Sequence, residues 1–270
     1  MEIIDKLRKG FLLIAVCLVC LGQTIAQTTV AKIGSDEYTT LQAAVDAAYE
    51  MTGDVTIEIV QDINGDYAVV REKNNLYITI NGNNHALEGQ IVVMGMDVQN
   101  GQSSLTVENL NISYDPASGY ELKPGDAMLF VPDCRFNTGD PFWDPSKDGS
   151  WWREHGITIT SSPSNHPSKI TVRNCTFTMP SYSVNPKLTA IRTSNSVASP
   201  YGITLENLTI KGGHSFAQFG APQKYYGSDT AIIILNCTYT EDTHNGINIS
   251  EGADNIIFVI KNTTVSTPDG

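Results

Sequence analysis

The chain has 270 residues, 41% of them hydrophobic and 8% aromatic, and its formal net charge is −12. This excess of negative charge argues against partners such as nucleic acid or anionic lipid headgroups, because like charges repel. It also disfavours an anionic polysaccharide such as pectate, unless a basic groove or bound cations offset the field.

Residues 1–26 have the features of a secretory signal peptide. Three cations precede the apolar run Phe11–Leu21, and the small residues Thr24 and Ala26 suit cleavage before Gln27. The apolar run is about half the length needed to cross a bilayer, so we expect no membrane span after the leader is removed. We expect a protein that is secreted or displayed on the cell surface, with the periplasm as the alternative.

Removal of the leader leaves 14 of the 17 cationic and 27 of the 29 acidic residues, a net charge of about −13. It also leaves three cysteines, Cys134, Cys175 and Cys237. An odd number of cysteines argues against a scaffold held together by disulfides.

The mature chain begins with a predicted strand and helix, which we expect to form a cap over residues 27–54. A helix is predicted within Glu37–Glu50, where Thr39 and Gln42 stand three residues apart, as a capping box requires. Its apolar residues recur at helical spacing and form one stripe: Leu41, Ala44, Val45 and Ala48.

Over residues 55–270 the pattern changes to short β-branched runs that repeat. Each unit is an alternating strand, an asparagine and a second alternating strand. The units are Tyr77–Gly82, Leu105–Ile112, Ile170–Phe177, Ile203–Ile210, Ile232–Tyr239 and Phe258–Val265. A third strand accompanies most units, at Gln90–Gly95, Gly156–Thr160, Thr189–Thr193, Ser215–Phe219 and Gly246–Ser250. The repeat predicts a parallel β-helix with three strands per coil.

One asparagine follows the first strand of every unit. Asparagine tolerates the left-handed backbone of a sharp corner, and its amide both donates and accepts hydrogen bonds. Because stacked coils lie about 4.8 Å apart, successive amides can form a ladder. The alternative is a set of unrelated asparagine turns. The predicted ladder consists of Asn81, Asn109, Asn174, Asn207, Asn236 and Asn262.

The spacings between these asparagines are 28, 65, 33, 29 and 26 residues. The spacing of 65 indicates either one coil with a long excursion or two coils, one of which lacks its asparagine.

Four ladder positions also begin Asn-x-Thr sequons. We interpret these asparagines as inward-facing ladder residues rather than glycosylation sites, and the following threonines as outward strand positions. Cys175 and Cys237 fall in the same column as Leu110 and Leu208, so we expect buried thiols too far apart for a disulfide. The sequons begin at Asn174, Asn207, Asn236 and Asn262.

Two segments resemble a known superfamily. Ile78–Leu87 resembles the opening coil of pectate-lyase-like right-handed β-helices, and Lys32–Ala48 resembles the N-terminal cap of their secreted bacterial members. The resemblance implies an all-β, right-handed parallel β-helix with an N-terminal capping helix. It implies no particular activity, because this scaffold hosts lyases, hydrolases, adhesins and passive stalks.

The catalytic patterns of these relatives do not carry over. Pectate lyases of this fold use an acidic cluster for calcium and an Arg or Lys base, but no Arg-x-Pro-x-x-Arg occurs here. Polygalacturonase-like relatives combine paired aspartates with Gly-His-Gly, which Gly212–Ser215 only partly matches. The remaining acid/base candidates are Asp242 and His244, with His214 about one coil earlier. The alternative is a solvated bend, since these residue types are common in turns.

A long loop is predicted at about 114–155, and it contains all three tryptophans. Exposed aromatic rings beside carboxylates suit a sugar, which stacks its apolar face and hydrogen-bonds through its hydroxyls. The alternative is that the rings pack the loop against the helix wall as a small core of its own. The candidate ligand-binding residues are Phe142, Trp143, Asp144, Trp151 and Trp152.

The function we favour is that of a non-catalytic secreted or surface β-helix that binds an extracellular polysaccharide or cell-surface glycan, or serves as a stalk. The alternative is a polysaccharide lyase or glycoside hydrolase. We expect no cofactor or metal, with calcium only under the lyase alternative. No polar cap is predicted after the last coil, which favours a binding or structural role over catalysis.

Overall fold

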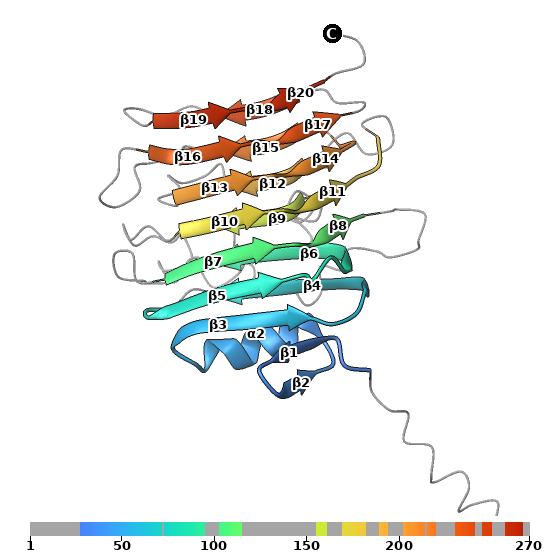
Figure 1. Ribbon diagram of the computed structural model, residues 1–270, viewed down its shortest axis with the longest axis vertical. Helices are drawn as coiled ribbons and strands as arrows, with labels where there is room; N and C mark the ends of the chain where they lie inside the picture. Colours follow the sequence, from blue (N-terminus) through green and yellow to red (C-terminus); the bar gives the residue numbers. More distant parts are fainter. Residues whose placement is uncertain are drawn as a thin grey trace, which may run out of the picture.

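The computed structural model describes residues 28–71, 73–94, 103–114, 155–160, 169–181, 189–193, 202–213, 215–219, 230–240, 245–249 and 257–266. These residues form a stack of coils with its axis vertical in Figure 1. The predicted signal peptide lies outside the described residues.

The coils have three faces, and one strand of each successive coil pairs in parallel with the next along every face. Face A holds β3 (Gly53–Ile59), β5 (Leu76–Asn81), β7 (Ser103–Glu108), β10 (Lys169–Arg173), β13 (Gly202–Glu206), β16 (Thr230–Leu235) and β19 (Ile257–Lys261). Face B holds the start of β6 (Ala86–Met94) and then β8 (Asn111–Ser113), β11 (Thr176–Thr178), β14 (Thr209–Lys211), β17 (Thr238–Thr240) and β20 (Thr264–Val265).

Face C holds the end of β6 and then β9 (His155–Thr160), β12 (Thr189–Thr193), β15 (Ser215–Phe219) and β18 (Asn245–Ile249). β4 (Ile63–Arg71) pairs with the whole length of β6 beneath faces B and C. The predicted β-helix with three strands per coil is therefore confirmed.

The spacing of 65 residues between Asn109 and Asn174 is a single coil. β7 pairs directly with β10, and β8 pairs directly with β11, so no further coil lies between them. The additional residues enter between β8 and β9, which is where the long loop is predicted.

The N-terminal end carries an antiparallel pair, β1 (Ala31–Ile33) and β2 (Asp36–Tyr38), followed by α2 (Leu41–Tyr49). The helix lies within the predicted range Glu37–Glu50, and Glu37 itself pairs with β1 as part of β2. The predicted cap at Thr39 is wrong. The Thr40 side chain accepts a hydrogen bond from the Ala43 N–H at 3.1 Å and caps the helix.

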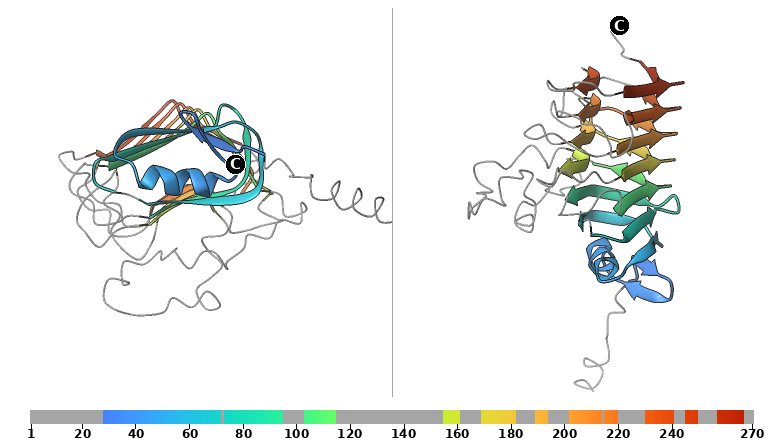
Figure 2. Two further views of the ribbon diagram at one scale, coloured as in Figure 1. Left: turned by 90° about the horizontal axis from the view of Figure 1, so that it is seen from below. Right: turned by 90° about the vertical axis from the view of Figure 1, so that its left-hand side faces the viewer.

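Gln42 has another role than the predicted capping box. Its side chain accepts from the Val69 N–H at 2.7 Å and donates to the Val69 carbonyl at 3.3 Å, which ties α2 to β4. The apolar stripe of α2 is buried as predicted, and the helix lies across the end of the first coil (Figure 2). Of the helices in the described ranges, none is long and apolar enough to cross a membrane.

The core is the interior of the coil, filled by the alternate residues of all three faces. Backbone hydrogen bonds from Thr176 to Leu110, from Thr209 to Cys175 and from Thr238 to Leu208 place Leu110, Cys175, Leu208 and Cys237 in successive coils. All four side chains are buried, and both cysteines are free thiols, as predicted.

We expect these two thiols to be unreactive in the native protein. Burial raises the pKa of Cys175 to about 11 and also raises the pKa of Cys237, so neither forms the nucleophilic thiolate at pH 8. In a mature chain carrying Cys134→Ser, iodoacetamide at pH 8 should label neither thiol until denaturant is added, when mass spectrometry should show two labels. Rapid labelling of the folded chain would contradict the burial.

Candidate functional site

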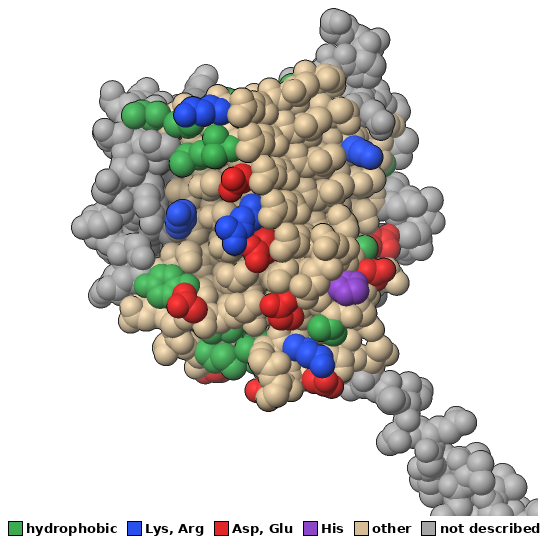
Figure 3. Space-filling model, in the orientation of Figure 1, with side chains coloured by type: hydrophobic (Ala, Val, Ile, Leu, Met, Phe, Trp, Pro, Cys, Tyr) green, Lys and Arg blue, Asp and Glu red, His purple; other side chains and the backbone are tan. Residues whose placement is uncertain are grey.

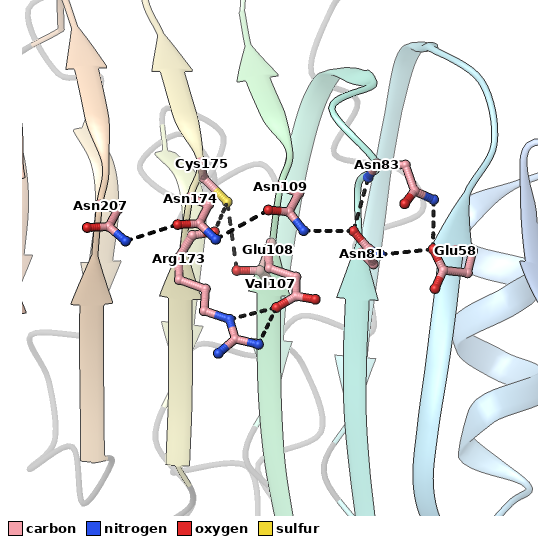
Figure 4. A network of polar contacts seen from close by, with 10 residues as sticks. All are labelled: Glu58, Asn81, Asn83, Val107, Glu108, Asn109, Arg173, Asn174, Cys175 and Asn207. Carbon is pink, nitrogen blue, oxygen red and sulfur yellow. Dashed lines mark hydrogen bonds and ion pairs between the residues drawn. The ribbon is translucent and has the colours of Figure 1, made fainter.

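The asparagine ladder runs along the corner between faces A and B. Each Nδ2 donates to the Oδ1 of the asparagine one coil earlier, at 3.1 Å from Asn109 to Asn81 and 3.3 Å from Asn174 to Asn109. The bonds continue at 3.0 Å from Asn207, 3.1 Å from Asn236 and 3.1 Å from Asn262. The predicted ladder is confirmed, and Figure 4 shows its first four members in one file.

The first member of the ladder differs from the others. Asn109, Asn174, Asn207, Asn236 and Asn262 have φ between 51° and 55°, which is the left-handed region that asparagine tolerates. Asn81 is instead the last residue of β5 and stands in register with Glu108, so only its side chain joins the ladder. Its amide donates to the Glu58 carboxylate at 3.0 Å, where the ladder ends.

The predicted inward direction of the ladder asparagines is wrong. Asn174, Asn207, Asn236 and Asn262 are exposed, whereas the residues that follow Asn174, Asn207 and Asn236 are buried. The left-handed residue sends its own side chain outward and turns the next one into the core. The ladder is thus part of the outer surface.

Face B presents two outward side chains per coil, at the second and fourth positions after each ladder asparagine. Residues at the second position stand in register from coil to coil, as do those at the fourth position in the first four of these coils. Nine of the ten are Asn, Ser or Thr, and the tenth is Lys211. We call this set the face B array: Asn111 and Ser113, Thr176 and Thr178, Thr209 and Lys211, Thr238 and Thr240, and Thr264 and Ser266.

Within the described parts of the chain, the threonine hydroxyls of the face B array have no side-chain partner. Asn111 donates to the Asn84 carbonyl at 2.7 Å, but no threonine of the array has a side-chain hydrogen bond to any other residue that the structure describes. Seven of the ten side chains of the array, Lys211 among them, are exposed, and the other three are half-buried. The described residues therefore leave the hydrogen-bonding capacity of these threonines unused.

Face A differs although it belongs to the same coils. Threonines stand in register at Thr79, Thr106, Thr171 and Thr204, but the column continues as Ile233 and Val259. The column beside it contains the ion pair of Glu108 with Arg173, whose Nε lies 2.6 Å from the carboxylate. Figure 3 shows charged and apolar side chains on the left, over face A, and an almost continuous uncharged area on the right, over face B.

The residues predicted as a site lie outside the described residues, but the strands that flank them are described. The tryptophan-containing residues 115–154 join β8 to β9, His214 lies between β14 and β15, and Asp242 and His244 lie between β17 and β18. Since these strands stack in order along faces B and C, all three connections start and end at the same corner of the helix. The predicted site residues that lie outside the described residues are Phe142, Trp143, Asp144, Trp151, Trp152, His214, Asp242 and His244.

The structure describes one His–Asp contact, between the residue before β4 and the residue before β6. His85 Nδ1 is 3.1 Å from Asp62 Oδ1, which also accepts from the Ala86 N–H at 2.9 Å. These two hydrogen bonds, first the one from Ala86 and then the one from His85, lower the pKa of Asp62. The carboxylate thereby ties the start of β6 to the first coil, which is a structural role.

No group of three or more His, Cys, Asp or Glu side chains in the described ranges could hold a metal ion. Glu88 has one buried carboxylate oxygen without a hydrogen bond to any described residue. It stands beside Asn64 and Ser113 at the base of face B, and no second ionisable group joins it in a metal site.

Sequence reasoning missed the face B array, although its signal is present. The second and fourth positions after each ladder asparagine are polar in all five coils, while the first and third are mostly apolar. When each threonine is considered only as one outward strand position, the clustering of these threonines on a single face is overlooked.

Residues 98–270 match the family model for the right-handed β-helix region. Neither the curated proteins nor the solved structures include a match to the chain. The family match covers well over half of the 270 residues and takes in the coils from β7 onward. The chain therefore belongs to the right-handed β-helix family.

Proposed function

We propose that this β-helix works outside the cytoplasm as a non-catalytic protein that binds a polysaccharide or cell-surface glycan. The proposed contact is the connection between β8 and β9, through Phe142, Trp143, Trp151 and Trp152 with Asp144 beside them. Aromatic rings stack on the apolar face of a sugar, and a carboxylate accepts hydrogen bonds from its hydroxyls.

One observation carries this proposal: all three tryptophans of the chain belong to a single connection whose two ends are fixed in one coil. β8 and β9 each pair with strands on both sides, so the connection starts and ends on a rigid part of the helix. A rigid support lowers the entropy lost on binding. The acidic composition favours a neutral or cationic glycan.

We expect the mature chain to retain glycans on an array without releasing sugar from them. Trp143→Ala or Trp151→Ala should weaken binding about fivefold to thirtyfold, because each removes a stacking surface worth about 1–2 kcal/mol. The matched control is Tyr77→Ala in β5, which removes an aromatic ring from face A, a face that this connection does not join. Unchanged binding in both tryptophan variants, with urea midpoints equal to the wild type, would exclude the connection as the site.

A second candidate function is a polysaccharide lyase or glycoside hydrolase that uses Asp242, His244 and His214. The supporting observation is that their two connections start at the same corner of adjacent coils, since Lys211 pairs with Thr240 and Ser215 with Asn245. This candidate predicts release of new chain ends from some glycan, abolished by Asp242→Asn. Release that persists in this variant would exclude the assignment, and a complete lack of release supports the binding role.

A further inference from the structure

The face B array carries one charged residue, Lys211, and nine uncharged ones, although the chain has a net charge of −12. Figure 3 shows few charged side chains over the strands of face B, on the right, and more of them over face A, on the left. A polyanion would be repelled by the chain as a whole, and a polycation would find its carboxylate partners elsewhere. The charge distribution therefore selects an uncharged partner for this face.

The side chains of the array also lack what a protein or membrane partner needs. Protein interfaces are anchored by aromatic, methionine or arginine side chains, and membrane surfaces by large apolar and basic ones. Apart from Lys211, the array offers hydroxyl, amide and methyl groups instead, and Glu88 stands beside Ser113 at its base. Each threonine hydroxyl of the array can donate one hydrogen bond and accept two, which matches a partner rich in hydroxyls.

The array repeats once per coil, over five coils in register. With about 4.8 Å between parallel strands, the array extends about 19 Å along the helix axis. An extended polysaccharide likewise repeats its hydroxyls once per sugar unit, whereas a single sugar could meet only one or two coils. The ladder of Asn109 to Asn262 fixes the spacing of these coils, so the array is ordered before any partner arrives.

We propose that face B binds a neutral, linear polysaccharide chain that lies extended along the helix axis across β8, β11, β14, β17 and β20. The inference rests on the proposed function in that the partner is a glycan, but the site differs from the tryptophan-containing connection. The hydroxyls of Thr176, Thr209 and Thr238 form the centre of the site. They exchange hydrogen bonds with the sugar hydroxyls of successive units.

The experiment replaces hydroxyls without changing the shape of the face. The test variant carries Thr176→Val, Thr209→Val and Thr238→Val, which stack in successive coils of face B. The matched control carries Thr79→Val, Thr106→Val and Thr171→Val, which stack in successive coils of face A. Binding is measured by affinity electrophoresis and calorimetry with mixed-linkage β-glucan, xyloglucan, galactomannan and, as an anionic comparison, polygalacturonate.

We expect at least one neutral polymer to bind the wild type, and its affinity to fall about tenfold or more in the face B variant and to be unchanged in the face A control. Equal effects of the two triple variants, or no effect of either, would overturn the inference. So would binding restricted to polygalacturonate. Should the face B variant fail to fold, the single exposed substitution Thr209→Glu takes its place, and normal binding by that variant would overturn the inference as well.

The two proposals are distinguishable with the same polymers. Loss of binding in the face B variant alone supports this inference and removes the tryptophan-containing connection as the main site. Loss in Trp143→Ala or Trp151→Ala alone supports the proposed function and overturns this inference. Short glycans retained on an array by a chain that binds none of the neutral polymers would also support only the proposed function.

Discussion

Replacing Asn207 with alanine should lower the free energy of unfolding by about 2–4 kcal/mol. Its Nδ2 donates to Asn174 at 3.0 Å, and its Oδ1 accepts from Asn236 at 3.1 Å, so truncation removes two ladder bonds. Neutral hydrogen bonds contribute about 0.5–1.5 kcal/mol each, toward the lower end where water can replace them, as at this exposed position. Alanine must also adopt the left-handed φ of 53°, at a cost of about 1–2 kcal/mol.

A glycine at the same position separates these two contributions. Asn207→Gly removes the same hydrogen bonds but adopts a positive φ without steric cost, so it should destabilise by only about 1–2 kcal/mol. The comparison is made from urea unfolding curves of the three proteins, with circular dichroism as the probe. Equal midpoints for the alanine and glycine variants would mean that the backbone conformation contributes nothing at this corner.

Asn262→Ala is a matched control at the end of the ladder. This residue has nearly the same φ, 51°, but donates one ladder bond and accepts none from the described residues. Its substitution should therefore cost about 1 kcal/mol less than that of Asn207. A larger loss at Asn262 would contradict an additive ladder.

The ladder shows how far the sequence determines this fold. The repeat and the asparagine at each corner could be predicted because few residues tolerate a left-handed corner, and because strand alternation is strict on either side. The direction of the asparagines was predicted wrongly, although the sequence contains the necessary signal. Leu110 and Cys175 directly follow Asn109 and Asn174, and two consecutive residues in such a bend cannot both face the core.

The ends of elements were harder to predict because tertiary contacts decide them. Thr39 and Thr40 are equally good helix caps by composition, and Thr40 takes the role because Asp36–Tyr38 pairs with β1. Gln42 fits a capping box, but the Val69 backbone competes for its amide. The corner after β5 contains Gly82, Asn83 and additional residues. Asn81 therefore stands in register with Glu108, one position before the ladder residue Asn109.

The candidate site could be predicted only in part, for a different physical reason. Residue types such as Trp143 or Asp242 indicate chemistry, but convergence depends on which coil and corner each connection occupies. The stacking of β8, β11, β14 and β17 supplies that corner, and it depends on strand pairing between residues far apart in the chain. The same stacking gathers separate threonines into one face, which no single unit of the repeat contains.

Replacing Gly89 with alanine should have the largest effect on stability of any single substitution considered for this chain. Gly89 lies in β6 opposite Asp66, where β4 contains an irregularity between Asn64 and Asp66. A Cβ on Gly89 would lie 1.7 Å from the Asp66 carbonyl oxygen and 2.8 Å from its carbon, and φ is +155°. Because the obstructing atoms are backbone, the clash cannot be relieved by rotating a side chain.

We therefore expect Gly89→Ala to separate β4 from β6 locally and to lower the free energy of unfolding by at least about 3 kcal/mol. Gly34→Ala is the matched control, since Gly34 also has a positive φ, +59°, but nothing lies within 4 Å of a Cβ there. It should cost only about 1–2 kcal/mol for the left-handed backbone. Urea midpoints and the yield of soluble protein measure both. If the two variants unfold at the same urea concentration, the close approach of Gly89 to Asp66 does not hold the first two coils together. A loss of stability in the Gly89 variant alone shows that the pairing of β4 with β6 depends on this close approach.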